Sequence, residues 1–155
     1  MKLKTKREIG KISYDLRGQG SQIVTVNGAF DLFHVGHLEI LEQAKKQGDY
    51  LIVGLNSDSS VKSYKGQNRP IVSEKNRVRL LSALECVDYV TIFDEPEIAV
   101  PLIRLVRPLV HVNGAEYGEN CVESTVLREI GARLYLVDKY RDFSTSNLIK
   151  KIKEL

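Results

Sequence analysis

Apolar residues along this chain form two patterns, short continuous runs and longer stretches with helical spacing. The continuous runs predict buried strands, at residues 23–26, 50–55, 88–93, 108–112 and 133–137. The stretches between them carry apolar residues three or four positions apart and predict helices, at 35–46, 61–64, 73–84, 96–106, 122–130 and 144–152. Because strands alternate with helices, we expect an α/β fold with a doubly wound, five-stranded parallel sheet and helices on both faces.

Residues 1–20 differ from the rest of the chain in charge. They contain six basic and two acidic residues, so they carry +4 while the remainder carries −1 of the formal net charge of +3. Apolar residues from Ile9 to Leu16 have the spacing of a short helix over 5–17, and a frayed basic tail is the alternative. We therefore expect a basic lead-in segment at 1–20 and a domain at 21–155.

The composition argues against several classes of protein. A nearly neutral domain argues against a nucleic-acid partner. No apolar run approaches the roughly 18 residues of a membrane span, and no apolar segment of a signal peptide follows the basic N-terminus. Cys86 and Cys121 lie far apart without metal-ligand spacing, and we expect small buried residues in a reducing compartment. A cytoplasmic protein with no membrane partner is expected.

A polar, glycine-containing loop joins the strand at 23–26 to the helix that follows, and it spans residues 27–37 with the sequence Asn-Gly-Ala-Phe-Asp-Leu-Phe-His-Val-Gly-His. His34 and His37 lie on one face of that helix near its N-terminus, where N–H groups and the helix dipole favour anions. Gly36 leaves room for a phosphate to approach the backbone. The pattern predicts a triphosphate site; a capping histidine and a core histidine are the alternative. No zinc site is expected, because further ligands at matching spacing are absent from the sequence.

Two other stretches add candidate anion ligands. The polar segment at 62–70 carries Lys62, Lys65 and Arg69, and we expect a mobile loop that closes over an anion, with a solvated charged loop as the alternative. Three hydroxyls at 144–146 open the last helix, which is more than one cap requires. Right-handed crossovers place this helix start and the His34 loop at the same edge of the sheet.

Other phosphate chemistries lack their motifs in this sequence. It contains no G-x-x-x-x-G-K-[ST], no G-x-G-x-x-G after the first strand and no G-x-S-x-G, which argues against a P-loop enzyme, a dinucleotide dehydrogenase and a serine hydrolase. Direct attack of a substrate phosphate on a nucleoside α-phosphate fits the remaining donors.

The phrase at 27–37 resembles the signature of the HxGH nucleotidyltransferase superfamily, the cytidylyltransferase-like group, whose members join a phosphorylated substrate to a nucleoside triphosphate and release pyrophosphate. The resemblance covers residues 23–153 and implies a single Rossmann-like domain. It implies catalytic roles for His34, His37 and Lys65. It implies nucleotide binding by Gly28, Ala29, Phe30, Gly36, Arg77 near the rim, Asn113, Gly114, Ser144, Thr145 and Ser146. It implies sugar-phosphate binding by Asp31, Lys62, Arg69 and Glu116.

Phrases at 27–31, 56–60, 65–70 and 144–147 look like the adenylyltransferase branch of ADP-heptose synthesis, which occurs alone or as the C-terminal half of a bifunctional kinase–adenylyltransferase. The resemblance implies the stand-alone type, which transfers AMP from ATP to D-glycero-D-manno-heptose 1-phosphate and releases pyrophosphate. ADP-heptose feeds the lipopolysaccharide core or related surface glycans. The partners implied are ATP, a sugar phosphate and a second copy in a homodimer, with Mg²⁺ held mainly by ATP phosphates and water.

The chain departs from the pattern of that branch at one loop. The branch usually has Lys-Gly where this chain has Asn113-Gly114, so a neutral amide replaces a cation. Related cytidylyltransferases carry Arg-Thr-Glu-Gly-Ile-Ser-Thr where residues 139–145 retain only the end, which argues against CTP. The alternatives are a glycerol-3-phosphate cytidylyltransferase, an FMN adenylyltransferase and, outside enzymes, an ATP-binding sensor module.

Overall fold

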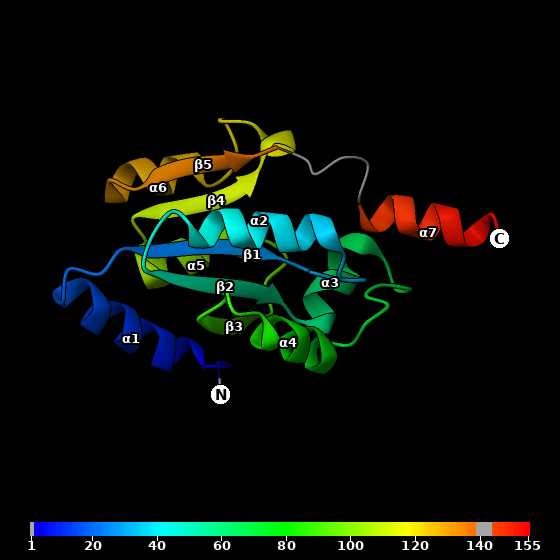
Figure 1. Ribbon diagram of the computed structural model, residues 1–155, viewed down its shortest axis with the longest axis horizontal. Helices are drawn as coiled ribbons and strands as arrows, with labels where there is room; N and C mark the ends of the chain where they lie inside the picture. The colour runs from blue at the N-terminus through cyan, green and yellow to red at the C-terminus, as the bar shows by residue number, and fades with distance from the viewer. Residues whose placement is uncertain (1, 139–143) are drawn as a thin grey trace.

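A computed structural model describes residues 2–138 and 144–155. Its centre is one parallel sheet of five strands in the order β3-β2-β1-β4-β5 (Figure 1). The strands are β1 (Ile23–Gly28), β2 (Tyr50–Asn56), β3 (Tyr89–Phe93), β4 (Val110–Gly114) and β5 (Arg133–Val137). The expected doubly wound Rossmann-like fold is confirmed, and the strand order reverses at β1. Between β1 and β4 the sheet therefore has the switch point at which open α/β sheets bind ligands.

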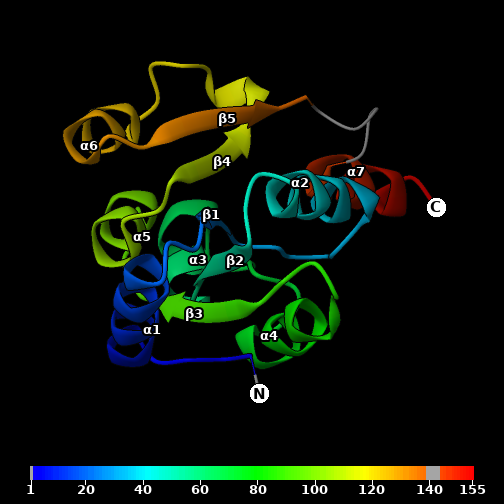
Figure 2. The ribbon, with the colours of Figure 1, turned by 60° about the vertical axis from the view of Figure 1, so that its left-hand side comes forward.

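Helices cover both faces of the sheet. They are α1 (Lys6–Gly18), α2 (Val35–Lys45), α3 (Asp58–Lys65), α4 (Glu74–Ala83), α5 (Ala99–Val106), α6 (Ser124–Ile130) and α7 (Thr145–Lys153), with a short 3-10 helix η1 (Ala115–Tyr117) after β4. Figure 2 shows α2 and α4 on one face and α1, α5 and α6 on the other. In the described part of the chain, no helix combines the length and apolar character needed to cross a membrane.

The sheet separates two apolar layers because successive strand residues point to opposite faces. Val24 and Val26 of β1 pack with Leu41 of α2 and Leu81 of α4 in one layer. Ile23 belongs to the other layer, which is completed from α1 and α5. Strands buried on both sides must be apolar throughout, which explains why their sequences are continuous apolar runs.

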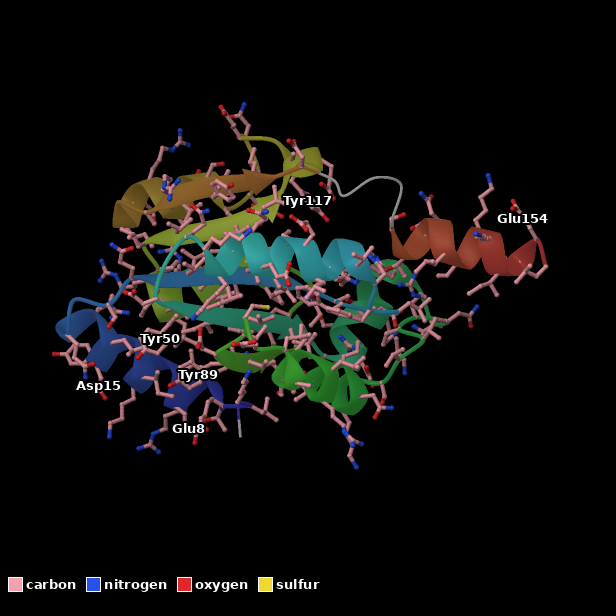
Figure 3. All side chains as sticks on the ribbon, viewed as in Figure 1. Glu8, Asp15, Tyr50, Tyr89, Tyr117 and Glu154 are labelled. Atoms are coloured by element: carbon pink, nitrogen blue, oxygen red, sulfur yellow. The ribbon has the colours of Figure 1, made fainter. Side chains whose placement is uncertain are left out.

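The N-terminal segment forms the expected helix and not the frayed tail. Thr5 caps α1 in a capping box with Glu8, whose side chain lies on the outer face (Figure 3). Ile9 is fully buried against the α5 side of the sheet. Leu3 forms a parallel bridge to Val90, so the segment before α1 also covers part of the β3 edge. The division of the chain at residue 20 remains a prediction.

Three sequence predictions need correction. Helix α3 begins at Asp58 instead of residue 61, because the Ser57 hydroxyl accepts a hydrogen bond from the Ser60 backbone and caps the helix earlier. Helix α5 begins at Ala99 instead of 96. Cys86 and Cys121 are free thiols but only half-buried. The cytidylyltransferase phrase was compared with residues 139–145, of which 139–143 lie outside the described residues.

His111 of β4 is fully buried and predicts how stability depends on pH. Its Nδ1 lies 2.8 Å from the Thr25 hydroxyl, and burial lowers the pKa of the imidazole to about 3. In the unfolded chain the histidine pKa is near 6.5, so His111 is protonated below that pH. In the folded chain His111 stays neutral down to about pH 3. The stability due to neutral His111 is thus complete above about pH 6.5 and falls by about 1.4 kcal/mol per pH unit below it.

His111→Gln is expected to reduce the slope of the unfolding free energy against pH by the equivalent of about one bound proton, because glutamine does not titrate. The measurement is the free energy of unfolding in urea at several pH values between about 4 and 7. An unchanged slope in the variant would assign the proton uptake to other groups.

Candidate active site

A pocket of about 560 Å³ opens at the carboxyl edge of the sheet. Ten residues predicted for the site line it: Gly28, Ala29, Phe30, Asp31, His37, Lys65, Asn113, Gly114, Glu116 and Thr145. The other predicted residues lie outside its lining: His34, Gly36, Lys62, Arg69, Arg77, Ser144 and Ser146. The sequence therefore located the pocket, but several of the expected ligand contacts are placed differently.

The loop after β1 turns sharply to bring His37 to the pocket, with the His34 ring stacked on it. Phe30 and Leu32 both have φ of +48°, in the left-handed region that residues with side chains seldom adopt. The Phe30 ring packs so closely on Gly28 that a Cβ there would lie 3.2 Å from it. Gly28 thus lets the Phe30 ring pack close to the end of β1, and the strained turn fixes the approach of the chain to α2.

His34 and His37 carry unpaired imidazole nitrogens at the start of α2. His34 is the N-cap, and its Nδ1 accepts a 3.1 Å hydrogen bond from the Gly36 backbone N–H. An accepting Nδ1 places the proton of neutral His34 on Nε2. That Nε2 and the Nδ1 of His37 are buried without partners among the described residues. The capping role of one histidine is real, but it leaves the other nitrogen available for a ligand.

The two imidazoles stack with ring centroids 3.9 Å apart. Burial lowers the pKa of His34. Burial, together with the nearby charges of His34 and Lys65, lowers the pKa of His37 to about 3. Without a ligand both rings are therefore neutral near pH 7, and an anion in the pocket would favour their N–H donors and their protonated forms.

Of the two candidate lysines, the structure places only Lys65 at the pocket. Both lie on α3 and not in a loop, because Ser57 starts the helix early. Both lysines are exposed, but Lys65 ends the helix at the pocket wall, whereas Lys62 lies one turn earlier and outside the lining. Partial burial and then the positive charge of Arg69 lower the pKa of the Lys65 ammonium. A cation held in this way gains from an arriving anion.

Lys65→Gln is expected to lower turnover by about tenfold to a hundredfold, the scale of one hydrogen bond to a charged group. Lys62→Gln is the matched control on the same helix and should stay within about twofold of wild type, as exposed charges away from a ligand contribute little. Pyrophosphate release by both purified variants measures the difference, and equal losses would reject the distinction between them.

Asp31 is placed differently from the expected sugar-phosphate ligand. Its buried carboxylate accepts hydrogen bonds from Arg69 Nε at 2.7 Å, Ile71 N at 2.9 Å and Val72 N at 2.8 Å. Burial raises its pKa, but the hydrogen bonds from Val72, Ile71 and Arg69 outweigh burial and hold the pKa below the usual value. Asp31 and the Nε of Arg69 therefore fasten the segment before α4 to the histidine loop, while the buried Arg69 Nη2 has no partner among the described residues. A ligand contact by Arg69 stays a prediction.

Arg77 was expected near the rim and is instead fully buried. Its guanidinium donates to Ala29 O at 2.6 Å, Asn56 O at 2.8 Å, Val72 O at 2.9 Å and Asp58 Oδ1 at 2.7 Å. Ala29 follows β1, Asn56 ends β2, Asp58 begins α3 and Val72 precedes α4. Because every nitrogen of the guanidinium already donates to a protein oxygen, Arg77 joins the segments that frame the pocket. Its contact with a nucleotide phosphate stays a prediction.

The hydroxyls at the start of α7 have three separate surroundings. Ser144 is the N-cap and accepts from the Asn147 backbone at 3.2 Å. Thr145 lines the pocket and donates to the Asp31 carbonyl at 2.9 Å. Ser146 is exposed outside the lining. The Thr145 contact confirms that the starts of α2 and α7 meet at one edge of the sheet.

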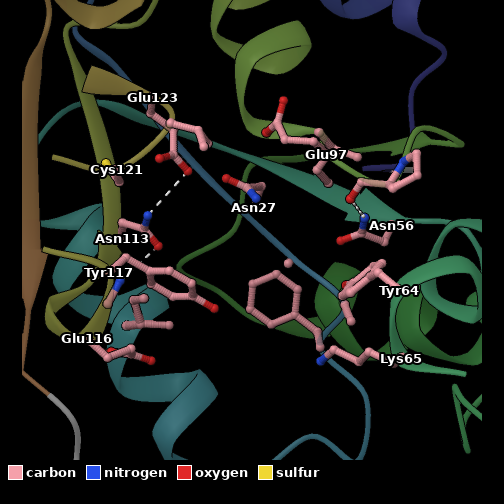
Figure 4. A pocket seen from close by; sticks show the side chains of 18 of the residues that line it. Asn27, Asn56, Tyr64, Lys65, Glu97, Asn113, Glu116, Tyr117, Cys121 and Glu123 are labelled. Atoms are coloured by element: carbon pink, nitrogen blue, oxygen red, sulfur yellow. Dashed lines mark hydrogen bonds between the residues drawn. The ribbon is translucent and has the colours of Figure 1, made fainter. Parts of the chain in front are cut away.

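The pocket wall beyond β4 is acidic and was largely missed. Asn113 donates to Glu123 Oε1 at 3.3 Å and accepts from the Gly114 backbone at 3.0 Å (Figure 4). The Glu116 carboxylate packs over Gly114, where any Cβ would collide with it. Glu123 also lines this wall, although it follows no motif and so gave no signal in the sequence.

Comparison with known proteins gives the same family. The family model described as cytidylyltransferase-like matches residues 25–153. The bifunctional protein HldE of Aliarcobacter butzleri is 46% identical over 152 residues, which cover 98% of this chain and 31% of that protein. HldE of Wolinella succinogenes is 46% identical over 145 residues, covering 93% and 30%. The chain thus spans about three tenths of the length of these relatives.

Two solved structures are similar in fold. The lipopolysaccharide core biosynthesis protein of Thermoplasma volcanium matches 78% of this chain and 98% of its own, with a TM-score of 0.61 and 29% identity. Pantoate-beta-alanine ligase of Francisella tularensis matches all of this chain and 78% of its own, with a TM-score of 0.70 and 15% identity, which shows the fold alone. From the family model and the HldE relatives together, the chain belongs to the cytidylyltransferase-like family and is a nucleotidyltransferase.

Proposed function

We propose that this chain transfers AMP from ATP to D-glycero-D-manno-heptose 1-phosphate, giving ADP-heptose and pyrophosphate. The observation that carries the transfer chemistry is the pair of unpartnered imidazole nitrogens of His34 and His37 beside Lys65 and the starts of α2 and α7. The heptose is supported by the four sequence phrases of that branch. Two similarities agree with a heptose substrate. The chain matches about three tenths of the bifunctional HldE proteins, and its fold resembles that of the lipopolysaccharide core biosynthesis protein.

In the proposed reaction an anionic oxygen of the sugar phosphate attacks the α-phosphorus of ATP. The bond from the α-phosphorus to the bridging oxygen breaks, and its electron pair leaves with pyrophosphate. A sugar phosphate is already ionised near pH 7, so the protein needs no general base. His34 and His37 supply N–H donors to the phosphate oxygens, and Lys65 supplies positive charge as negative charge builds on the leaving group.

Mg²⁺ is expected to enter this site on the triphosphate. The described residues contain no group of three or more His, Cys, Asp and Glu side chains that could hold a metal ion. The Asp31 oxygens are already occupied by protein donors. ATP phosphates and water would therefore supply most ligands, and the ion would shield the charge of the phosphates when bound.

The proposal is tested by pyrophosphate release with Mg²⁺, combining ATP or CTP with heptose 1-phosphate or glycerol 3-phosphate. We expect release only with ATP and the heptose. Release with CTP and glycerol 3-phosphate would keep the proposed chemistry but replace both substrates. A further assay with FMN and ATP tests the alternative of an FMN adenylyltransferase. ATP binding without release from any phosphate would instead favour the sensor module. The homodimer remains a prediction, and light scattering on the purified protein would test it by measuring the molar mass in solution.

A further inference from the structure

Glu123 is a buried acidic side chain of the pocket with one unused acceptor. It lies between η1 and α6 and is 5% exposed. Oε1 accepts from the Asn113 side chain, while Oε2 is out of contact with solvent and has no hydrogen-bond partner among the described residues. A buried carboxylate oxygen without a donor is costly in free energy, which is why such groups in folded proteins usually meet a ligand or an ordered molecule.

The surroundings of Glu123 limit the kind of donor that would satisfy it. Glu116 also lines the pocket wall beyond β4, and we call Glu116 and Glu123 the acidic wall. Glu97 adds a third carboxylate to the pocket lining. Lys65 is the one lysine or arginine among the described lining residues, and Figure 4 shows its side chain well away from Glu123. Like charges would repel a phosphate here. Neutral O–H donors fit the acidic wall, and both proposed substrates carry them on a sugar.

We propose that Glu123 is a specificity-determining residue that accepts a hydrogen bond from a sugar hydroxyl of a bound substrate, and this rests on the function proposed above. Asn113 holds the carboxylate by donating to Oε1, which leaves Oε2 for the substrate. The amide at 113 donates to Oε1 without placing a positive charge beside the carboxylate. The phosphates bind at the opposite side, near His37 and Thr145.

The hydroxyl belongs either to the ribose of the nucleotide or to the sugar phosphate, and binding measurements separate the two. Calorimetry gives the affinities of wild type and Glu123→Gln for ATP, 2′-deoxy-ATP and 3′-deoxy-ATP. A second series uses heptose 1-phosphate and its monodeoxy derivatives in the presence of α,β-methylene-ATP. Glutamine keeps the size of the side chain and an acceptor for Asn113, and thermal unfolding checks that the variant folds. Glu119→Gln, an exposed change outside the pocket lining on the same loop, is the matched control.

We expect one deoxy ligand to bind wild type and Glu119→Gln about tenfold to a hundredfold more weakly than its parent, and to bind Glu123→Gln within about twofold of its parent. Loss of this discrimination requires contact with the hydroxyl, because a merely structural role would weaken all ligands alike. The proposal is overturned if the variant discriminates as wild type does in both series, or if neither parent ligand binds. Binding is read without turnover, so a lack of pyrophosphate release would count against the proposed function alone.

Discussion

Replacing either histidine of the α2 start is expected to lower pyrophosphate release by about a hundredfold to a thousandfold, the scale of losing one donor to the transition state. His37→Ala removes a ring whose Nδ1 has no protein partner among the described residues, so activity should fall while the fold is retained. His34→Ala also removes the N-cap of α2, which by itself costs about 1 kcal/mol of stability. The two effects of His34 must therefore be separated.

His34→Asn makes that separation, because asparagine is a good N-cap but lacks the distal ring nitrogen. We expect it to unfold like wild type and to be nearly as inactive as His34→Ala. His111→Gln is the control, because it removes a histidine that does not line the pocket. It should retain activity near pH 7 once its folding is verified. Turnover at the wild-type rate in folded His34→Asn and His37→Ala would reject the catalytic assignment.

The strands and the histidine loop were predictable because their signals are local. The central strands are buried on both faces and so are largely apolar, as Val24 and Leu51 show with no exposed surface. The loop places glycine and histidine where a strand passes into a helix, and the free N–H groups of a helix start favour anions. The position of the site at the carboxyl edge of the sheet therefore follows from local sequence signals, without any long-range contact.

The roles of Asp31, Arg77 and Glu123 could not be derived in this way, since they depend on partners distant in the chain. Asp31 meets the backbone of Ile71 and Val72, about forty residues later. Arg77 was expected near the rim beside the apolar face of its helix, and its full burial depends on acceptors from the loop after β1 and the end of β2. Charged residues near a phosphate motif were therefore expected to be ligands, whereas two of them hold the frame of the site.

Arg77→Met is expected to lower the free energy of unfolding by about 3–5 kcal/mol. The carbonyls of Ala29 and Asn56 would each lose a buried donor, and an unmet buried acceptor costs about 1–3 kcal/mol. Arg77→Lys should recover only part of this loss, because one ammonium cannot reproduce the planar fork that reaches acceptors on separate loops.

Urea unfolding measures this effect, and the same helix provides its control. Arg79 is exposed, so Arg79→Met should change the free energy of unfolding by no more than about 0.5 kcal/mol. If Arg77→Met stays within about 1 kcal/mol of wild type, water or neighbouring donors must satisfy the carbonyls, and the frame would not depend on the guanidinium. A large loss with a normal Arg79→Met would instead show that the arginine near the phosphate motif acts on the pocket through the loops it joins. Activity in Arg77→Met should then fall with the folded fraction and with the disorder of the Ala29 loop.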